Sequence, residues 1–259
     1  MPEMIEIEQY RRVADLTVGR TIRRVDAPDD WYLKGGTTAR ALRSALREAQ
    51  VTGTRRIGKL LLYETDGPTL GLRFGMTGRL IVDGQAPIER LEYSSARVEP
   101  AWIRFALQFD GGGSLEVVDP RRLGGVALDP GEGHLGPDAL AITPARLRDA
   151  LGASRAPLKA WLLDQSRVAG VGNLLADEVL WRAGLDPARI ASSLTPAEVR
   201  RLHRYLGTTI RELSNRGGSH TGDLQVARQR GALCPRDGTP LLRRTIGGRT
   251  TYSCPGHQG

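Results

Sequence analysis

The sequence predicts an α+β protein in which an antiparallel β-sandwich with flanking helices precedes a helical region and a short C-terminal β-hairpin. Short β-branched and leucine-rich runs, broken by Asp-Gly turn signals, occupy much of residues 58–118. Helix-like patterns replace them from about residue 143. A short run between two cysteines near the C-terminus is typical of a hairpin. A barrel is the alternative arrangement of the predicted strands.

The individual elements follow from caps, periodicity and turn residues. A first helix over 5–17 is expected to end near Gly19, and Thr37 or Thr38 caps a second helix that continues to about Ala49. Strands are expected around 58–64, 69–74, 79–83, 102–109 and 115–118. Helices are expected near 143–151, 156–166, 173–183 and 195–214, and the hairpin spans roughly 240–253.

A cluster of glycine and proline residues at 130–142 marks the main domain boundary. We expect an N-terminal β-sandwich domain at 1–130, a helical domain at 131–220 and a C-terminal hairpin segment at 221–259. A chain of 259 residues can form two domains with a small appendage. Four tryptophans are expected to pack inside these parts: Trp31, Trp102, Trp161 and Trp181.

The chain is basic, with 37 Lys plus Arg residues against 29 Asp plus Glu residues and a net charge of +8. This balance favours a polyanionic partner, although a solvated basic surface gives the same count. The N-terminal sequence MPEMIEIEQYRR lacks the basic and apolar regions of a secretory signal, and no run approaches the ~20 apolar residues of a membrane span. We therefore expect a cytoplasmic protein without a membrane partner. We also expect a monomer.

The most specific pattern is VAGVGNLLADEVLWRAGLDP, residues 168–187. Gly170 and Gly172 permit a tight turn, and Asn173 is expected to cap the helix that follows. Two helices that meet at such a turn direct backbone N–H groups and the Asn173 amide outward, where a DNA phosphate can accept them. A helical hairpin packed only for stability has the same spacing.

With the preceding LLDQSR, this segment resembles the helix-two-turn-helix (H2TH) signature of the formamidopyrimidine-DNA glycosylase/endonuclease VIII (Fpg/Nei) family. Further motifs of that family follow its order: MPE, RRIGKLLL, FGMTGRL, DPRRLGG and RTTYSCP. The resemblance runs from residue 2 to residue 258. It implies a catalytic β-sandwich, an H2TH domain and a zinc-finger-like hairpin. It also implies a bifunctional DNA glycosylase and abasic-site lyase of base excision repair that acts on damaged double-stranded DNA.

The resemblance implies Pro2 as the nucleophile, Glu3 as its acid/base partner and Lys59 as the active-site lysine. Once Met1 is removed, Pro2 exposes a secondary amine. Because α-amines have pKa values of about 7.7–8.0, a far larger fraction of them than of lysines is neutral near pH 7.5. Attack on the sugar C1′ expels the damaged base and leaves an iminium, which permits β,δ-elimination of both phosphates. Glu3 could move the protons, and Lys59 would hold a flanking phosphate.

A nucleotide that is flipped out of a duplex leaves a gap that protein side chains fill. The resemblance places Met76, Arg121 and Leu123 at the three gap-filling positions, with Leu123 in place of the usual phenylalanine. An arginine can hydrogen-bond the orphaned partner base, and apolar side chains can wedge between base steps. The resemblance also places Asn173 at the H2TH turn and Arg249 at the tip of the finger hairpin among the DNA-binding residues.

The C-terminal finger departs from the family pattern of two Cys-x-x-Cys pairs. Cys234 pairs with Asp237 and Cys254 pairs with His257, so each pair has lost one thiolate. Aspartate and histidine are both competent zinc ligands, and we expect one Zn²⁺ bound by these four residues. The alternative is a zincless finger in which Asp237 and His257 pair electrostatically.

A second departure concerns the substrate. Only fifteen residues, 219–233, lie between Gly218 and Cys234. Family members that remove 8-oxoguanine usually carry a much longer lesion-covering loop in this region. Together with Leu123, this argues against 8-oxoguanine specificity, although the MPEMIEIE start is closer to the Fpg branch.

Three functional hypotheses follow from these patterns. The first is excision of oxidised or ring-opened bases, and the second is a glycosylase specialised for an unusual adduct or crosslink. The third is a non-catalytic damaged-DNA-binding protein on the same scaffold. Pro2 and Glu3 favour the two enzymes, because a binding module has no need of them.

Overall fold

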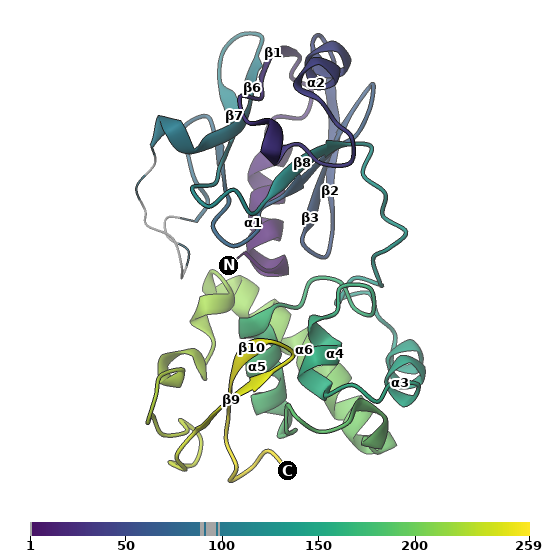
Figure 1. The fold of residues 1–259 in the computed structure, drawn as a ribbon, viewed down its shortest axis with the longest axis vertical. Coiled ribbons are helices and arrows are strands. Elements are labelled where there is room, and N and C mark those ends of the chain that lie inside the picture. Colours follow the sequence, from purple (N-terminus) through teal and green to yellow (C-terminus); the bar gives the residue numbers. More distant parts are fainter. Residues whose placement is uncertain (1, 89–90, 92–96, 98) are drawn as a thin grey trace. The chain divides into compact units, whose positions relative to one another are not determined.

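The computed structural model describes residues 2–88, 91, 97 and 99–259, and the chain divides into two compact units, residues 1–132 and 133–259 (Figure 1). Both four-stranded sheets lie in the first unit, and the second contains four α-helices and a two-stranded hairpin among its described residues. In the described part of the chain, no helix is both long and apolar enough to cross a bilayer. The α+β class predicted from the sequence is confirmed.

The N-terminal unit is an antiparallel sandwich of two sheets. Its helical elements are α1 (Met4–Asp15), η1 (Asp30–Tyr32), α2 (Ala39–Leu46) and η2 (Pro100–Trp102). Its strands are β1 (Ile22–Asp26), β2 (Val51–Ile57), β3 (Leu60–Thr65), β4 (Leu70–Arg73), β5 (Arg79–Val82), β6 (Ile103–Phe109), β7 (Ser114–Val118) and β8 (Gly125–Leu128). The strand orders are β1-β6-β7-β5 in one sheet and β2-β3-β4-β8 in the other.

One hydrophobic core joins the two sheets to α1. Leu72 of β4 and Phe105 of β6 come from opposite sheets and are fully buried in this core. Ile7, Tyr10 and Ala14 of α1 enter the same core at a spacing of three and four residues, which places them on one face of the helix. The start of α1 is therefore attached to a rigid support.

Strands β1, β2 and β8 are not among the predicted strands, because their sequences lack a regular alternation of apolar and polar residues. In β1 a register shift between Ile22 and Arg24 leaves Arg23 and Arg24 both exposed, which breaks the usual alternation. In β2, an edge strand, another register shift occurs at Gly53. Strand β8 has four residues and begins at Gly125.

Helix α2 begins as predicted, with Thr38 as its N-cap, but it ends at Leu46 and not at Ala49. The residues after Leu46 pair with the start of β1: the Glu48 backbone N–H donates to the Ile22 carbonyl (2.7 Å), and the Ile22 N–H donates to the Ala49 carbonyl (2.9 Å). These sheet-like bonds override the local helix propensity.

The C-terminal unit contains the predicted helices and the predicted hairpin. Its helical elements are α3 (Pro144–Gly152), α4 (Leu158–Leu163), α5 (Asn173–Ala183), η3 (Ala191–Ser193), α6 (Pro196–Arg216), η4 (Ser219–Thr221) and η5 (Gln225–Ala227). Strands β9 (Leu242–Ile246) and β10 (Arg249–Ser253) form the hairpin. Helix α6 has a capping box between Thr195 and Glu198 at its start and Gly217 at φ +103° at its end.

A buried ion pair anchors the hairpin to the helices of this unit. Lys159 of α4 and Asp177 of α5 are both fully buried, and their charged atoms lie 2.7 Å apart. The Lys159 ammonium also donates to Thr251 Oγ1 of β10 (2.8 Å), and Arg228 lies 3.1 Å from the other Asp177 oxygen. Because buried charges must be paired, these contacts fix the position of β10 on α4 and α5.

The tryptophan prediction is right for two residues and wrong for one. Trp161 and Trp181 are buried and Trp102 is half-buried, but Trp31 in η1 is 67% exposed. The neighbouring Tyr32 occupies the core position in its place. The Lys34 ammonium lies 4.9 Å from the centre of the Trp31 ring and covers part of it.

Candidate functional site

The N-terminal residues are held by a capping box at the start of α1. Pro2 and Glu3 are buried, and Glu3 is the N-cap residue. The Glu3 backbone N–H donates to Glu6 Oε2 (2.7 Å), and the Glu3 side chain accepts from the Glu6 backbone in return. Both carboxylates also lie at the positive end of the helix dipole. The backbone next to the Pro2 nitrogen is thereby fixed.

Tyr10 connects α1 to the turn that contains Met76. Its hydroxyl donates to the Gly78 carbonyl (3.2 Å), and its ring centre lies 4.7 Å from that of Phe74. Burial raises the pKa of Tyr10, so the phenol stays protonated and remains a donor. Phe74 and Gly78 flank the β4–β5 turn, and α1 therefore holds this turn in place.

The three predicted gap-filling residues lie on two adjacent loops. Met76 is half-buried in the β4–β5 turn, whereas Arg121 and Leu123 are exposed in the β7–β8 loop, and Leu123 is 50% exposed. Gly75 has φ +55°, and a Cβ atom there would overlap the backbone of Leu123 and Gly124. Only glycine allows the two loops to approach this closely.

Asp119 is a residue at this site that sequence reasoning missed. Its carboxylate is fully buried and accepts from Thr77 Oγ1 (2.6 Å) and from the backbone N–H groups of Leu123 and Gly124 (both 2.9 Å) and Arg121 (3.2 Å). An aspartate at the start of a proline- and glycine-containing loop is typical of a turn stabilised by its own side chain. That signal is present in the sequence but is not specific.

Lys59 lies in the two-residue turn between β2 and β3. Gly58, the other residue of the turn, has φ +56°. Arg56 donates to the Gly58 carbonyl (2.9 Å) and also pairs with Glu8 of α1 (3.3 Å). The turn that carries Lys59 is thus tied to the same helix that begins after Pro2 and Glu3.

At the H2TH turn, Asn173 is the first residue of α5 and Gly172 is the N-cap, so the prediction that Asn173 caps this helix is wrong. Gly172 has the extended backbone of a cap, and its carbonyl accepts the first helical hydrogen bond, from Ala176 (2.9 Å). Gly170 has φ +114°. Within the described residues, the buried Asn173 Oδ1 has no hydrogen-bond partner.

Gln165 holds this turn closed and was also missed from the sequence. Its amide nitrogen donates to the carbonyls of Leu163 and Val171 (both 2.9 Å), and its Oε1 accepts from the Gly170 N–H (2.9 Å). One side chain therefore connects the end of α4 to the residues just before α5. The sequence shows a glutamine at this position, but only the folded structure shows the three backbone groups that it binds.

The four predicted finger residues come together at the base of the hairpin. Ligand atoms of Cys234, Asp237, Cys254 and His257 all lie within 4.8 Å of one another, so the group could hold a metal ion. Cys254 Sγ lies 3.3 Å from Asp237 Oδ2, and Cys234 Sγ lies 3.9 Å from His257 Nδ1. His257 Nδ1 and Asp237 Oδ2 are 2.7 Å apart, which is a hydrogen-bond distance.

Residues around this group orient it and set its charge. The Trp181 indole N–H donates to Cys234 Sγ (3.3 Å), and His257 Nε2 lies 3.2 Å from the Trp181 carbonyl. The backbone N–H of Thr239 and the His257 ring lower the pKa of Asp237, so this carboxylate is ionised. Burial raises the pKa of the Cys254 thiol.

Arg249 is exposed at the start of β10, directly after the hairpin turn. The turn residues Gly247 and Gly248 have φ +59° and +70°, a conformation that glycine pairs adopt in tight hairpins. Gly247 also packs against Ala160 of α4. The tip of the hairpin is therefore supported, and Arg249 extends from a fixed base.

The segment after α6 is pinned to α5 by Glu178. Its carboxylate accepts from the backbone N–H groups of Asp223 (3.0 Å) and Leu224 (2.9 Å), and Leu224 is fully buried. Gly222 packs so closely on Glu178 that a Cβ atom would overlap the carboxylate.

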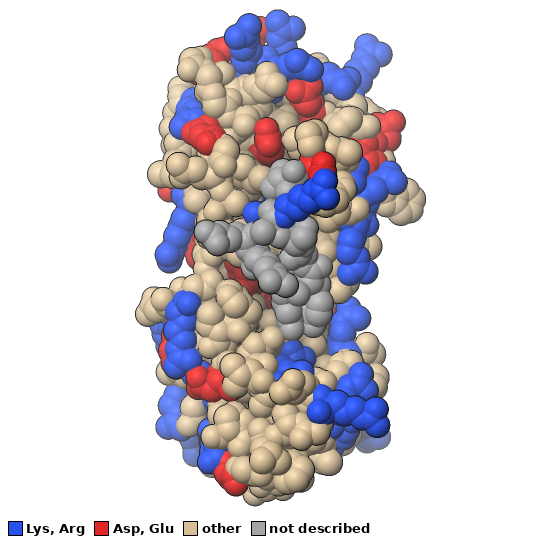
Figure 2. Space-filling model, turned by 90° about the vertical axis from the view of Figure 1, so that its left-hand side faces the viewer, with Lys and Arg blue, Asp and Glu red and all other residues tan. Residues whose placement is uncertain are grey.

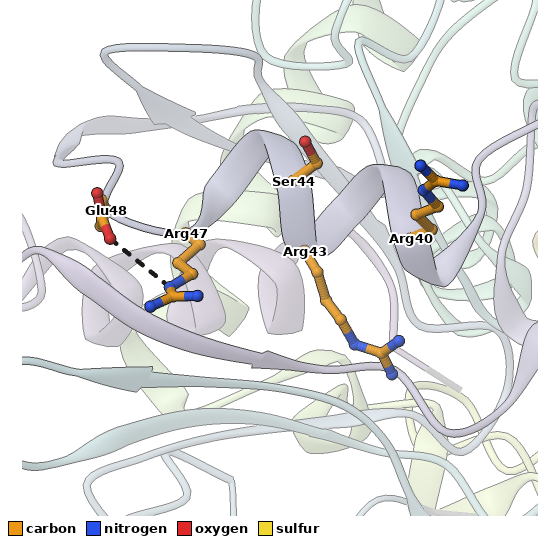
Figure 3. A pocket seen from close by; sticks show the side chains of 5 residues that line it. All are labelled: Arg40, Arg43, Ser44, Arg47 and Glu48. Atoms are coloured by element: carbon orange, nitrogen blue, oxygen red, sulfur yellow. Dashed lines mark ion pairs between the residues drawn. The ribbon is translucent and has the colours of Figure 1, made fainter.

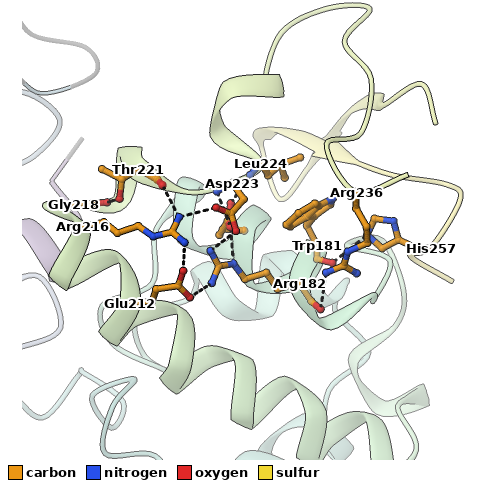
Figure 4. A network of polar contacts seen from close by, with 11 residues as sticks. Trp181, Arg182, Glu212, Arg216, Gly218, Thr221, Asp223, Leu224, Arg236 and His257 are labelled. Atoms are coloured by element: carbon orange, nitrogen blue, oxygen red, sulfur yellow. Dashed lines mark hydrogen bonds and ion pairs between the residues drawn. The ribbon is translucent and has the colours of Figure 1, made fainter. Parts of the chain in front are cut away.

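Charged side chains reinforce this attachment (Figure 4). Arg182 of α5 donates to Glu178 (2.7 Å), to Glu212 of α6 (2.6 Å) and to Asp223 (2.7 Å). Arg216, at the end of α6, lies 2.6 Å from the other Asp223 oxygen. The short segment that follows α6 is thus bound to both helices.

Basic side chains lie on the surface of both units. Figure 2 shows Lys and Arg side chains distributed over both units on the visible face. Arg40 and Arg43 of α2 and Arg47, which follows its last residue, line an open pocket with Ser44 and Glu48. Arg47 and Glu48 pair there at 3.6 Å (Figure 3). A second such pocket lies on α6 and is lined by Ala197, Arg200, Arg201 and Arg204.

A β-sandwich unit is followed by a helical unit in which the turn at residues 170–172 joins α4 to α5, and this arrangement indicates an H2TH protein. Comparison with known proteins supports this class. The family model described as the formamidopyrimidine-DNA glycosylase N-terminal domain matches residues 1–126, and that of the H2TH domain matches residues 135–224. The chain belongs to the Fpg/Nei family.

Relatives cover nearly the whole chain. The formamidopyrimidine-DNA glycosylase of Symbiobacterium thermophilum is 36% identical over 98% of this chain and 88% of its own length. That of Thermus thermophilus is 35% identical over 100% and 99%. Each alignment is longer than this 259-residue chain, at 284 and 289 positions, so both relatives contain residues that this chain lacks.

Solved structures show the same fold. The Lactococcus lactis Fpg in complex with DNA containing an abasic site is 25% identical, covers 100% of both chains and has a TM-score of 0.85. A MutM protein in complex with DNA containing carbocyclic 8-oxo-G is 26% identical over 99% of both chains, with a TM-score of 0.84.

Proposed function

We propose that this chain is a bifunctional DNA glycosylase and abasic-site lyase that excises oxidised or ring-opened bases from damaged duplex DNA in base excision repair. The two relatives named above are formamidopyrimidine-DNA glycosylases. The two solved structures are complexes with DNA that contains an abasic site or carbocyclic 8-oxo-G. The observation that carries the proposal is Pro2 next to the buried Glu3 at the capped start of α1. We also propose that the protein is a monomer and that it acts on DNA in the cytoplasm.

In this mechanism, the Pro2 nitrogen bonds to the sugar C1′, and the bond from C1′ to the damaged base breaks. The sugar ring then opens as its bond from C1′ to O4′ breaks, and the resulting iminium between C1′ and the Pro2 nitrogen withdraws electrons from the sugar, so that the 3′ and then the 5′ phosphate leave. Glu3 gives a proton to the opening sugar ring and accepts protons during elimination. Lys59 neutralises a phosphate beside the lesion.

The other proposed residues hold the DNA. Met76, Arg121 and Leu123 fill the gap left by the flipped nucleotide, and their position on two adjacent loops supports this role. Asn173 at the start of α5 and the exposed Arg249 beside the hairpin turn contact phosphates. We assign catalysis to residues 1–130, backbone binding to the H2TH domain at 131–220 and support of Arg249 to the finger at 221–259.

We also propose that the finger binds one structural Zn²⁺ through Cys234, Asp237, Cys254 and His257. Tetrahedral zinc with bonds of about 2.0–2.3 Å holds its ligand atoms roughly 3.2–3.8 Å apart, close to the sulfur contacts of 3.3 and 3.9 Å. A zinc-bound histidine usually donates its second ring N–H to a carbonyl, as His257 can to Trp181. Zinc would supply folding stability here and no catalytic step.

The attachment of the segment after α6 favours a second candidate substrate class. Glu178, Arg182 and Arg216 bind this segment to α5 and α6 through Asp223 and Leu224. We propose that a short segment held in this way leaves a flipped-out base uncovered. An enzyme specialised for a bulky adduct or crosslink is therefore the second candidate.

Borohydride trapping tests the enzymatic proposal. Wild-type protein should form a covalent adduct with a duplex that contains an abasic site. Pro2→Gly should form much less of it, because a flexible primary amine replaces the ring nitrogen. Glu3→Gln keeps the capping oxygen but cannot transfer the proton, so turnover should fall by about 10²–10⁴-fold. Glu48→Gln, an exposed change on the same unit, should have no effect. Absence of an adduct with the wild type would leave only a DNA-binding protein.

The salt dependence of binding tests the phosphate contacts. Binding to a duplex with a tetrahydrofuran abasic analogue is measured by fluorescence anisotropy between about 50 and 200 mM salt. Lys59→Ala and Arg249→Ala should each reduce the slope of log K against log salt by about 1, because each removes one phosphate contact. Arg43→Ala, in the α2 pocket, serves as the control. A wild-type slope in either variant would remove that residue from the interface.

Metal content distinguishes a zinc-bound finger from a zincless finger in which Asp237 and His257 pair. Purified wild-type protein should contain about one zinc per chain by atomic emission, and Asp237→Ala should contain much less, because it removes one of four ligands. Asp110→Asn, at an exposed turn, should retain the metal. A wild-type protein without zinc would instead support the Asp237–His257 pair.

Excision rates separate the two substrate classes. If the attached segment leaves the lesion uncovered, the kcat/KM for a ring-opened guanine with a bulky N7 substituent should equal or exceed that for 8-oxoguanine. Duplexes with either lesion opposite cytosine are compared from initial rates under multiple-turnover conditions. A preference for 8-oxoguanine of tenfold or more, about 1.4 kcal/mol, would exclude the second candidate.

A further inference from the structure

Two loops of the N-terminal unit cross from one sheet to the other. The β4–β5 turn leads from the sheet β2-β3-β4-β8 to the sheet β1-β6-β7-β5, and the β7–β8 loop leads back. Within the described residues, each strand ladder joins strands of one sheet only. Strand pairing of Arg73 with Gly125 and of Arg79 with Val118 holds the ends of the two loops together. The residues between these ends lie outside the ladders, so side chains must order them.

Asp119 provides that connection with a single carboxylate. Oδ1 accepts from Thr77 Oγ1 (2.6 Å) on the first loop and from Arg121 N–H (3.2 Å) on the second. Oδ2 accepts from the N–H groups of Leu123 and Gly124 (both 2.9 Å). Each partner is either a proposed gap-filling residue or the direct neighbour of one, since Thr77 follows Met76.

The backbone of the second loop is held in a conformation that it would not adopt alone. Arg122 has φ +56°, which is unfavourable for a residue with a side chain. Its guanidinium makes two hydrogen bonds to Asp29 (2.7 and 2.6 Å), and this pairing lowers the pKa of the Asp29 carboxyl. Arg104 donates to the Asp119 carbonyl (2.8 Å). The loop is thus braced on both sides.

We infer that Asp119 is a positioning residue that holds Met76, Arg121 and Leu123 as one preorganised unit for filling the gap in a lesion duplex. The inference rests on the proposed function, because it assigns the three side chains to gap filling. A buried carboxylate is costly unless its acceptor sites are used, and Asp119 accepts four hydrogen bonds that all order these two loops. Loops ordered before binding lose less conformational entropy when they insert into DNA.

The test separates gap filling from chemistry. Asp119→Asn replaces one acceptor oxygen with a donor that faces N–H groups, and Thr77→Val removes only the bond between the loops. 2-Aminopurine placed opposite a tetrahydrofuran abasic analogue becomes fluorescent when protein side chains unstack it, whether or not the protein is catalytic. Abasic-site cleavage is measured in parallel on duplex and on single-stranded DNA, which has no opposite strand to unstack.

Wild-type protein should raise the fluorescence, and Asp119→Asn should lower this rise and reduce the duplex-to-single-strand cleavage ratio at least about fivefold. Thr77→Val should change both quantities in the same direction by a smaller factor. It replaces Asp119→Asn as the test if that variant does not fold, as judged by circular dichroism. Asp110→Asn is the matched control and should behave as wild type.

Wild-type fluorescence and cleavage ratios in the folded variants would overturn the positioning role. An equal loss on duplex and single-stranded DNA would overturn it as well, because it would indicate a general structural defect. Failure of the proposed chemistry has a different signature. In that case the wild type raises the fluorescence but cleaves neither substrate, while the fluorescence difference between wild type and Asp119→Asn still supports positioning.

Discussion

A chain terminus is normally the most mobile part of a protein, yet the proposed chemistry requires the Pro2 nitrogen to stay within bonding distance of one sugar carbon. The reciprocal capping box between Glu3 and Glu6 meets this requirement, because it fixes the backbone at the first turn of α1. Tyr10 extends the same support to the β4–β5 turn through the Gly78 carbonyl. The proposed nucleophile and the proposed gap-filling turn are thus held by one helix.

Much of this arrangement could be predicted from the sequence where local patterns and family motifs agree. Helices α1, α3, α5 and α6 and the hairpin lie near their predicted positions, since caps and apolar spacing are local signals. The four finger residues come within ligand distance as their spacing implies. Met76 lies in a turn between two strands, as the sequence predicts for this proposed gap-filling residue.

The remaining features depend on contacts between distant residues. In β1 a register shift interrupts the alternation of buried and exposed residues. Helix α2 ends at Leu46 because the residues that follow pair with β1. Gly172 takes the capping position expected for Asn173, because the turn before α5 requires an extended residue there. Asp119 and Gln165 have no distinctive sequence signal. Their importance lies in the partners that the fold brings to them.

Mass spectrometry of the borohydride-trapped complex tests the central claim most directly. After digestion of the DNA and the protein, the sugar remnant should be found on the N-terminal peptide, attached to the nitrogen of Pro2, with Met1 absent. A remnant on a lysine-containing peptide such as the one with Lys59, or a mature chain that retains Met1, would contradict the account.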